Sequence, residues 1–351
     1  MKKNSTWKKL AALLLFTLVY FKIFGQAIIV NGDSANANKI HGVDRYHQIL
    51  RYNEPIMYLA FPVLKPILDR SVPLMEGEGK DGYWAEGHFG HRFVAFKGKY
   101  YNTPFAQRLR VTFDVSILTR LTRDNSNPLL PYNNKFGLGI DFLLSSLRSL
   151  DSGKGCMIWL TTQLHHYSNG QADSFFIDAP EKRNNYKSGD FSANYWRAII
   201  NISSNTHRKN LYMGGIGFQE ELDLEGPLSS SRQLKNYYGD GRVLLFFHWV
   251  KQSKLTIETV SRGFTKGTKI KRQVRRHVGL RTELDYLVGD LSEFPHNEKF
   301  RLGWHTYFTY LPSVSNQIGL MVHTSLGRDY LNMRFDDVVF LGSVGLYITF
   351  D

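Results

Sequence analysis

Residues 108–119 read RLRVTFDVSILT, and the alternation in this stretch decides the fold. Successive side chains of a strand point to opposite faces, so the stretch predicts a strand with one apolar and one polar face. The apolar face holds Leu109, Val111, Phe113, Val115 and Ile117. The opposite face holds Arg110, Thr112, Asp114 and Ser116. Such two-faced strands occur in soluble β-sandwiches and in membrane barrels, and strand length separates the two.

The same alternation recurs from about residue 91 in segments of the length that crosses a bilayer. A tilted membrane strand needs about 9–11 residues, whereas soluble strands average about 5–6. The fold class predicted is therefore all-β, an antiparallel transmembrane β-barrel of about 12 strands. The twelve expected strands are 92–100, 108–119, 136–142, 156–168, 192–204, 209–219, 242–251, 254–264, 277–288, 300–310, 316–326 and 340–350. A weaker thirteenth, 55–63, would break the even count usual for bacterial barrels.

The N-terminus has the composition of an export signal. Four lysines precede the apolar run 10–21, which is shorter than the ~20 residues of a spanning helix. We therefore expect residues 1–25 to be a signal peptide. Residues 26–90 contain Pro55, Pro62, Pro66 and Pro73, and we expect a periplasmic extension or plug there. Residues 91–351 would form the barrel, in the outer membrane of a Gram-negative bacterium.

Charge and cysteine content limit the possible functions. The 351-residue chain has a formal net charge of +13, and residues 266–276 form a basic run, KGTKIKRQVRR. Export argues against nucleic acid as a partner. The run is either a solvated loop or a loop that contacts phosphate groups of lipids or lipopolysaccharide. Cys156 is the single cysteine, which excludes an intrachain disulfide and a cysteine-rich metal site.

The stretch 163–170, QLHHYSNG, carries the chemistry. His166 and Ser168 are two residues apart on an expected strand, so both project from one face, with Cα atoms ~6.6 Å apart. A serine hydroxyl is a weak nucleophile until a base takes its proton, and that base needs a third group to fix its tautomer. Asn169 and Gly170 would then turn the chain into a loop.

Side-chain parity predicts which face this pair occupies. His166 and Ser168 share parity with the more apolar set of their strand, which contains Ile158, Leu160, Thr162 and Leu164. They are therefore expected to face lipid. On the next strand, Asn194 has the parity of Trp196, Ala198, Ile200 and Ile202. An antiparallel pair would bring Asn194 to His166 at one rim, where polar groups on an apolar wall are costly unless functional.

This motif resembles that of the outer-membrane phospholipase A family, a calcium-dependent twelve-stranded barrel that is active as a homodimer. The resemblance implies that Ser168 is the nucleophile, His166 the base and Asn194 the group that orients the histidine, with membrane phospholipids as substrate. It also implies calcium (Ca2+) bound by Asp173 and Ser126. Gln171 stands where the family usually has arginine, and we include it as a third candidate ligand.

Two other classes of protein remain open. Lipid A 3-O-deacylases also have His-x-Ser-Asn at a barrel rim, but we expect eight strands for them, so the strand count and Asn194 favour the phospholipase. The basic run 266–276 would suit lipid A phosphates. The third class is a porin-like barrel without enzymatic activity, in which the rim residues are incidental.

Overall fold

The computed structural model describes most of the chain beyond residue 45. It describes residues 46–47, 49–50, 56–64, 67–69, 83–100, 103–122, 130, 132–148, 155–177, 184–185, 188–206, 210–224, 230–231, 234, 238–252, 256–261, 269–274, 277–291, 300–312, 318–330, 335 and 337–348. The expected signal peptide and Ser126 lie outside these residues.

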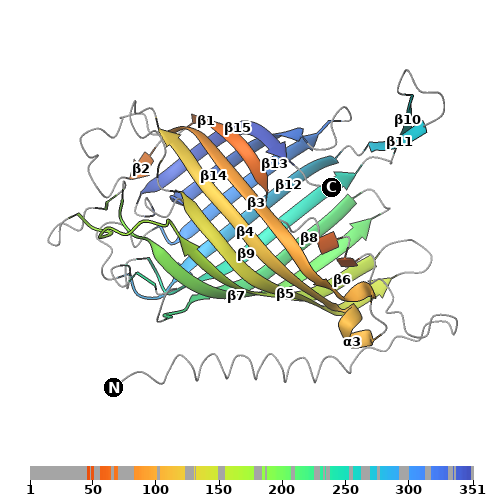
Figure 1. Cartoon of the computed structure of the whole chain (residues 1–351), viewed down its shortest axis with the longest axis horizontal. Helices are drawn as coiled ribbons and strands as arrows, with labels where there is room; N and C mark the ends of the chain where they lie inside the picture. Colours follow the sequence, from red (N-terminus) through yellow and green to blue (C-terminus); the bar gives the residue numbers. More distant parts are fainter. Residues whose placement is uncertain are drawn as a thin grey trace.

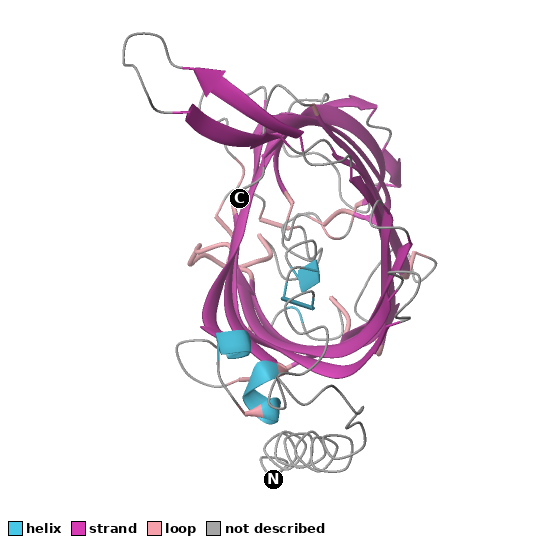
Figure 2. Ribbon diagram, turned by 90° about the vertical axis from the view of Figure 1, so that its right-hand side faces the viewer, coloured by secondary structure: helices cyan, strands magenta, loops and turns pink. Residues whose placement is uncertain are grey.

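Twelve antiparallel strands close into a barrel (Figures 1 and 2). Each strand pairs with its neighbours in the chain, and β1 pairs with both β3 and β15 to close the circle. The strands are β1 (Met57–Leu64), β3 (Tyr83–Lys97), β4 (Leu109–Thr122), β5 (Asn133–Arg148), β6 (Gly155–Ser168), β7 (Ser192–Thr206), β8 (Asn210–Glu221), β9 (Gly241–Gln252), β12 (His277–Val288), β13 (Leu302–Leu311), β14 (Ile318–Arg328) and β15 (Val338–Ile348). Closure removes free strand edges, as a bilayer requires.

Three further strands lie outside this circle. The short β2 (Ile67–Asp69) pairs with the start of β15. Strands β10 (Thr256–Ser261) and β11 (Lys269–Val274) form a separate two-stranded sheet, which projects from one end of the barrel (Figure 1). The single turns η3 (Gly98–Tyr100) and α3 (Pro104–Gln107) connect β3 to β4.

The expected total of twelve barrel strands is confirmed, but two assignments behind it were wrong and cancelled each other. Segment 55–63 is barrel strand β1, and segment 254–264 contributes β10 to the projecting sheet. Pro62 weakened the strand signal because proline cannot donate to a sheet ladder, and it lies next to a register shift against β15. The barrel therefore begins at Met57 and not at residue 91.

The two faces of the barrel differ as the alternation predicted. Apolar side chains stand exposed on the outside of the wall, including Phe113, Leu138, Leu164, Ile200, Leu245, Phe308, Leu320 and Leu346. Lipid covers such a face in place of water, so the soluble sandwich is excluded and the protein is a transmembrane β-barrel of the outer membrane. Among the described residues, no helix is long and apolar enough to cross a membrane.

An apolar cluster lies in the lumen near each end. At the end where β6 begins, Tyr46, Ile49 and Leu50 pack against inward side chains of the wall, including Trp159 and Met213. Figure 2 shows this short segment inside the ring of strands. At the other end, the connecting segments form a second cluster, which contains Phe175, Phe191, Leu234, Leu291 and Phe335. Part of the segment 26–90, where we expect an extension or plug, thus lies within the lumen.

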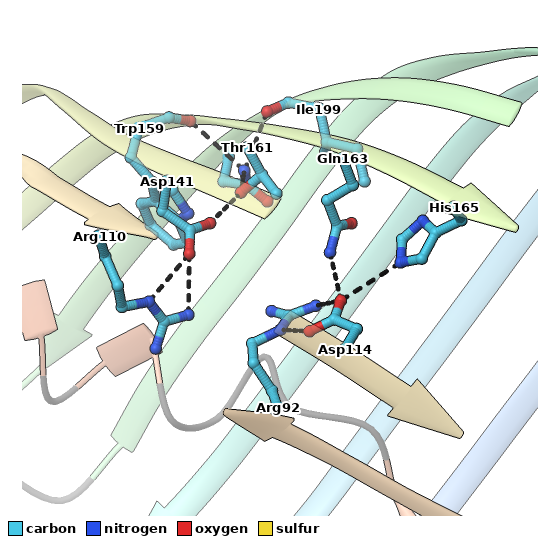
Figure 3. Close-up of polar contacts among 10 residues, drawn as sticks. Arg92, Arg110, Asp114, Asp141, Trp159, Thr161, Gln163, His165 and Ile199 are labelled. Carbon is cyan, nitrogen blue, oxygen red and sulfur yellow. Dashed lines mark hydrogen bonds and ion pairs between the residues drawn. The ribbon is translucent and has the colours of Figure 1, made fainter. Parts of the chain in front are cut away.

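Ion pairs occupy the lumen between the two clusters. Arg92 contacts Asp114 at 2.6 Å, Arg110 contacts Asp141 at 2.9 Å, and all four side chains are buried. Figure 3 shows these two pairs, with Gln163 and His165 also directed at Asp114. Buried charges are tolerated only when paired, and each of these two arginines is paired with an aspartate.

Candidate active site

The candidate site lies where β6 ends and β7 begins. The strands are antiparallel, and their register places His166 opposite Asn194 and Ser168 opposite Ser192. Along β6 the odd-numbered side chains from Met157 to His165 are buried in the lumen, whereas the even-numbered ones are more exposed. His166 and Ser168 therefore project outward on the face of Leu164, which is 45% exposed. Their position on the lipid side agrees with the parity argument.

His166 and Asn194 are joined by a hydrogen bond. The distance between His166 Nδ1 and Asn194 Oδ1 is 2.9 Å. An amide oxygen can only accept, so Nδ1 carries the proton and Nε2 is left as an acceptor. This is the tautomer that a general base needs. The ring also packs against Phe136, with the ring centres 4.8 Å apart.

A serine that sequence reasoning missed fixes the Asn194 amide. Asn194 Nδ2 donates to Ser230 Oγ at 3.4 Å, and the Ser230 hydroxyl donates to the Leu222 carbonyl at 3.3 Å. With Nδ2 donating to Ser230, the Asn194 side chain presents Oδ1 to His166. Asn194 is only 2% exposed. No signal in the sequence distinguishes Ser230 from the serines beside it.

Ser168 is half-buried on the same face as the imidazole. Among the described side chains, its hydroxyl makes no hydrogen bond to His166, whose ring contacts Asn194 and Phe136. Nucleophile–base contacts are often long in the absence of substrate and shorten when it binds.

Asn169 of the motif has a structural role. Its side chain is fully buried, and Nδ2 donates to the Gly189 carbonyl at 2.7 Å. Its Oδ1 accepts the backbone N–H groups of Phe191 at 3.0 Å and Gln171 at 3.2 Å. Asn169 therefore ties the start of the β6–β7 connection to its end. Gly170 has φ = +66°, a left-handed conformation that suits the expected turn.

The structure describes two of the three expected calcium ligands. Asp173 is exposed, and its backbone is held by Ser188 and Asp190 through bonds of 3.2 and 2.7 Å. Gln171 is half-buried two residues earlier, and Ser126 lies outside the described residues. No group of three His, Cys, Asp or Glu side chains converges within the part of the chain described. The oxygen donors of Asp173 and Gln171 nevertheless fit calcium by type.

Comparison with known proteins finds likeness only among solved structures. No protein-family model matches the sequence, and no curated protein matches it. Outer membrane phospholipase A from Escherichia coli is 12% identical, with a TM-score of 0.47 over 84% of this chain and 90% of that one. The calcium-bound outer membrane phospholipase dimer of Salmonella typhi is 11% identical, with the same TM-score and the same two coverages.

A third structure is more distant. LpxR from Salmonella typhimurium is 8% identical, with a TM-score of 0.31 over 76% of this chain and 89% of that one. Likeness at these levels of identity concerns the barrel and not the chemistry. The chemistry of this chain must therefore be inferred from its own residues.

Proposed function

We propose that this protein is an outer-membrane serine hydrolase that cleaves acyl esters of membrane glycerophospholipids, a phospholipase A. The observation that carries the proposal is the 2.9 Å bond between His166 and Asn194 on the lipid-facing wall, with Ser168 on the same face. Polar side chains in that position are costly without a function. A phospholipid ester lies at the same depth as a strand end at the rim.

Asn194, His166 and Ser168 would each have a separate role in ester hydrolysis. Asn194 holds the His166 ring by Nδ1–H and so keeps Nε2 free to accept a proton. His166 Nε2 takes the proton of the Ser168 hydroxyl while Oγ attacks the ester carbonyl carbon. The imidazolium then donates that proton to the departing glycerol oxygen, which leaves the acyl group on Ser168. Water, activated by His166, releases the fatty acid.

Calcium dependence and a homodimeric active form complete the proposal, and the resemblance of the motif supports both. Asp173 is exposed three residues after the turn at Gly170, on the connection that follows Ser168. Asp173, Gln171 and Ser126 would hold calcium, which when bound polarises the ester carbonyl and stabilises the oxyanion.

Crosslinking of the purified chain tests the homodimer. We expect a crosslinked dimer with calcium, and monomer alone with and without calcium would contradict it.

Two observations count against the rival functions. The basic run 266–276 includes β11, which follows the end of β9 at the rim opposite His166. The described strand of this run therefore lies at the other rim from the site, which counts against its contact with a lipid A molecule held at the site. Apolar clusters at both ends of the lumen, with ion pairs between them, count against a porin-like channel.

The test is lipid hydrolysis by the purified full chain in mixed micelles. We expect fatty acid release from phosphatidylethanolamine with calcium, little release with a chelator, and none above background for Ser168→Ala. Ser192→Ala is the matched control, because Ser192 lies directly opposite Ser168 on the same face. Release of an acyl chain from lipid A alone would establish a deacylase instead. No hydrolysis of either lipid, with swelling of liposomes, would establish a channel.

A further inference from the structure

A cavity of about 400 Å³ lies inside the barrel between the two apolar clusters, separate from the outward-facing site. Four acidic side chains line it: Asp114, Glu283, Asp285 and Asp329. Each already forms an ion pair with an arginine, at distances between 2.5 and 3.1 Å. Each acidic group of the cavity therefore has an ion-pair partner other than Lys135 and Arg197.

Lys135 and Arg197 line the same cavity and have neutral partners. Lys135 Nζ lies 5.6 Å from the centre of the Tyr195 ring. Arg197 Nε donates to the amide oxygen of Gln163. Among the described residues, neither cation forms an ion pair with a carboxylate.

The contacts of Asp114 show that it has little capacity left for these two cations. This carboxylate faces the same cavity and accepts from Arg92 at 2.8 Å and from Gln163 at 2.6 Å (Figure 3). His165 lies 3.4 Å from the same oxygen. Oδ1 of Asp114 also accepts from Arg92 Nε at 2.6 Å, so both carboxylate oxygens have donors, and Lys135 and Arg197 face the cavity without an ion-pair partner among the described residues.

Two half-buried cations without ion-pair partners are costly, and an anion between them would lower the cost. We propose that the cavity binds a phosphate-type oxyanion, either free phosphate or a phosphate monoester, between Lys135 and Arg197. A guanidinium offers a planar fork of donors and an ammonium a point charge, and both bind phosphate oxygens. A cavity of this size lies in the range of small-molecule sites, so a monoester fits as well.

Binding to the purified full chain in a zwitterionic detergent tests this proposal. Inorganic phosphate and glycerol 3-phosphate are titrated at constant ionic strength, with chloride as the balancing salt, while heat of binding and thermal unfolding are measured. We expect saturable binding of at least one of them and a raised unfolding midpoint. Tighter binding of glycerol 3-phosphate identifies a monoester as the ligand, and equal binding identifies free phosphate.

The variants Lys135→Met and Arg197→Met should each weaken binding about tenfold or more, since a charged hydrogen bond is lost. Each should also raise the unfolding midpoint in phosphate-free chloride buffer, because an unpaired charge is removed. Lys251→Met is the matched control, since Lys251 is exposed on β9 and does not line the cavity. No saturable binding, or equal binding by all three variants and the parent chain, would overturn the proposal.

Discussion

His165 and His166 are neighbours in the sequence and lie in opposite environments. His165 points into the lumen, where it lies 3.4 Å from Asp114 and packs against Tyr195. His166 points outward among apolar side chains and bonds to Asn194. Neither ring nitrogen of His165 faces a nucleophile, because Nε2 contacts Asp114 and Nδ1 is buried without a hydrogen-bond partner among the described residues. The outer chain of bonds ends in an open acceptor, His166 Nε2, and an open acceptor beside a serine is what distinguishes a catalytic arrangement from a structural one.

Replacing each histidine in turn tests this comparison most strongly. His166→Gln should lower the rate of ester hydrolysis about 10³-fold or more, because glutamine cannot take the serine proton. The barrel's stability should hardly change. His165→Gln should leave the rate per folded molecule nearly unchanged and lower the free energy of unfolding by about 1 kcal/mol. Kinetic assays and urea unfolding in detergent provide both measurements. Equal loss of activity in the two variants would contradict the assignment.

Replacing Asp114 in the lumen should lower the free energy of unfolding strongly without changing the rate of hydrolysis. Asp114→Asn leaves Arg92 buried beside a neutral group, and breaking a buried ion pair from one side costs about 3–5 kcal/mol. The free energy of unfolding in urea should fall by about that amount, while hydrolysis by the folded fraction is retained. Asp223→Asn, at an exposed position after β8, should change neither quantity. A loss of activity without loss of stability would mean that Asp114 serves the outer site.

Local patterns predicted the parts of the molecule that depend on local geometry. The alternation in residues 108–119 sets the two faces of β4, and the same rule put His166 and Ser168 on the outer wall. Asn194 followed from parity and antiparallel pairing, and its register opposite His166 agrees. These inferences needed only the two-residue period of a strand.

Contacts between distant segments were beyond such reasoning. β1 was undervalued because the sequence shows Pro62 but not the register shift beside it. Asn169 was taken for a turn residue, whereas its side chain holds Gly189 and Phe191 at the far end of the connection. Ser230 contacts Asn194 from an irregular connection, where the position of a residue in the sequence does not predict which way its side chain points.

Replacing Ser230 should have the smallest effect on activity of the substitutions considered. It tests the hydrogen bonds that join Ser230, Asn194 and His166. Ser230→Ala removes the acceptor of the Asn194 amide, a neutral hydrogen bond that contributes about 0.5–1.5 kcal/mol. If that energy orients Asn194 in the transition state, kcat should fall about 2–10-fold with KM unchanged.

A double-mutant cycle tests whether Ser230 orients the Asn194 side chain or only anchors the connection between β8 and β9. In the Asn194→Ala background, Ser230→Ala should have no further effect on kcat, because the group that Ser230 orients is gone. Ser231→Ala is the matched control, since Ser231 contacts Ser192 and Asp190 and holds the same connection without contacting Asn194. Two results would contradict this role: Ser231→Ala lowers kcat as much as Ser230→Ala, or the effects of the Asn194 and Ser230 substitutions add. In either case Ser230 only anchors the connection, and Asn194 alone sets the direction of the His166 hydrogen bond.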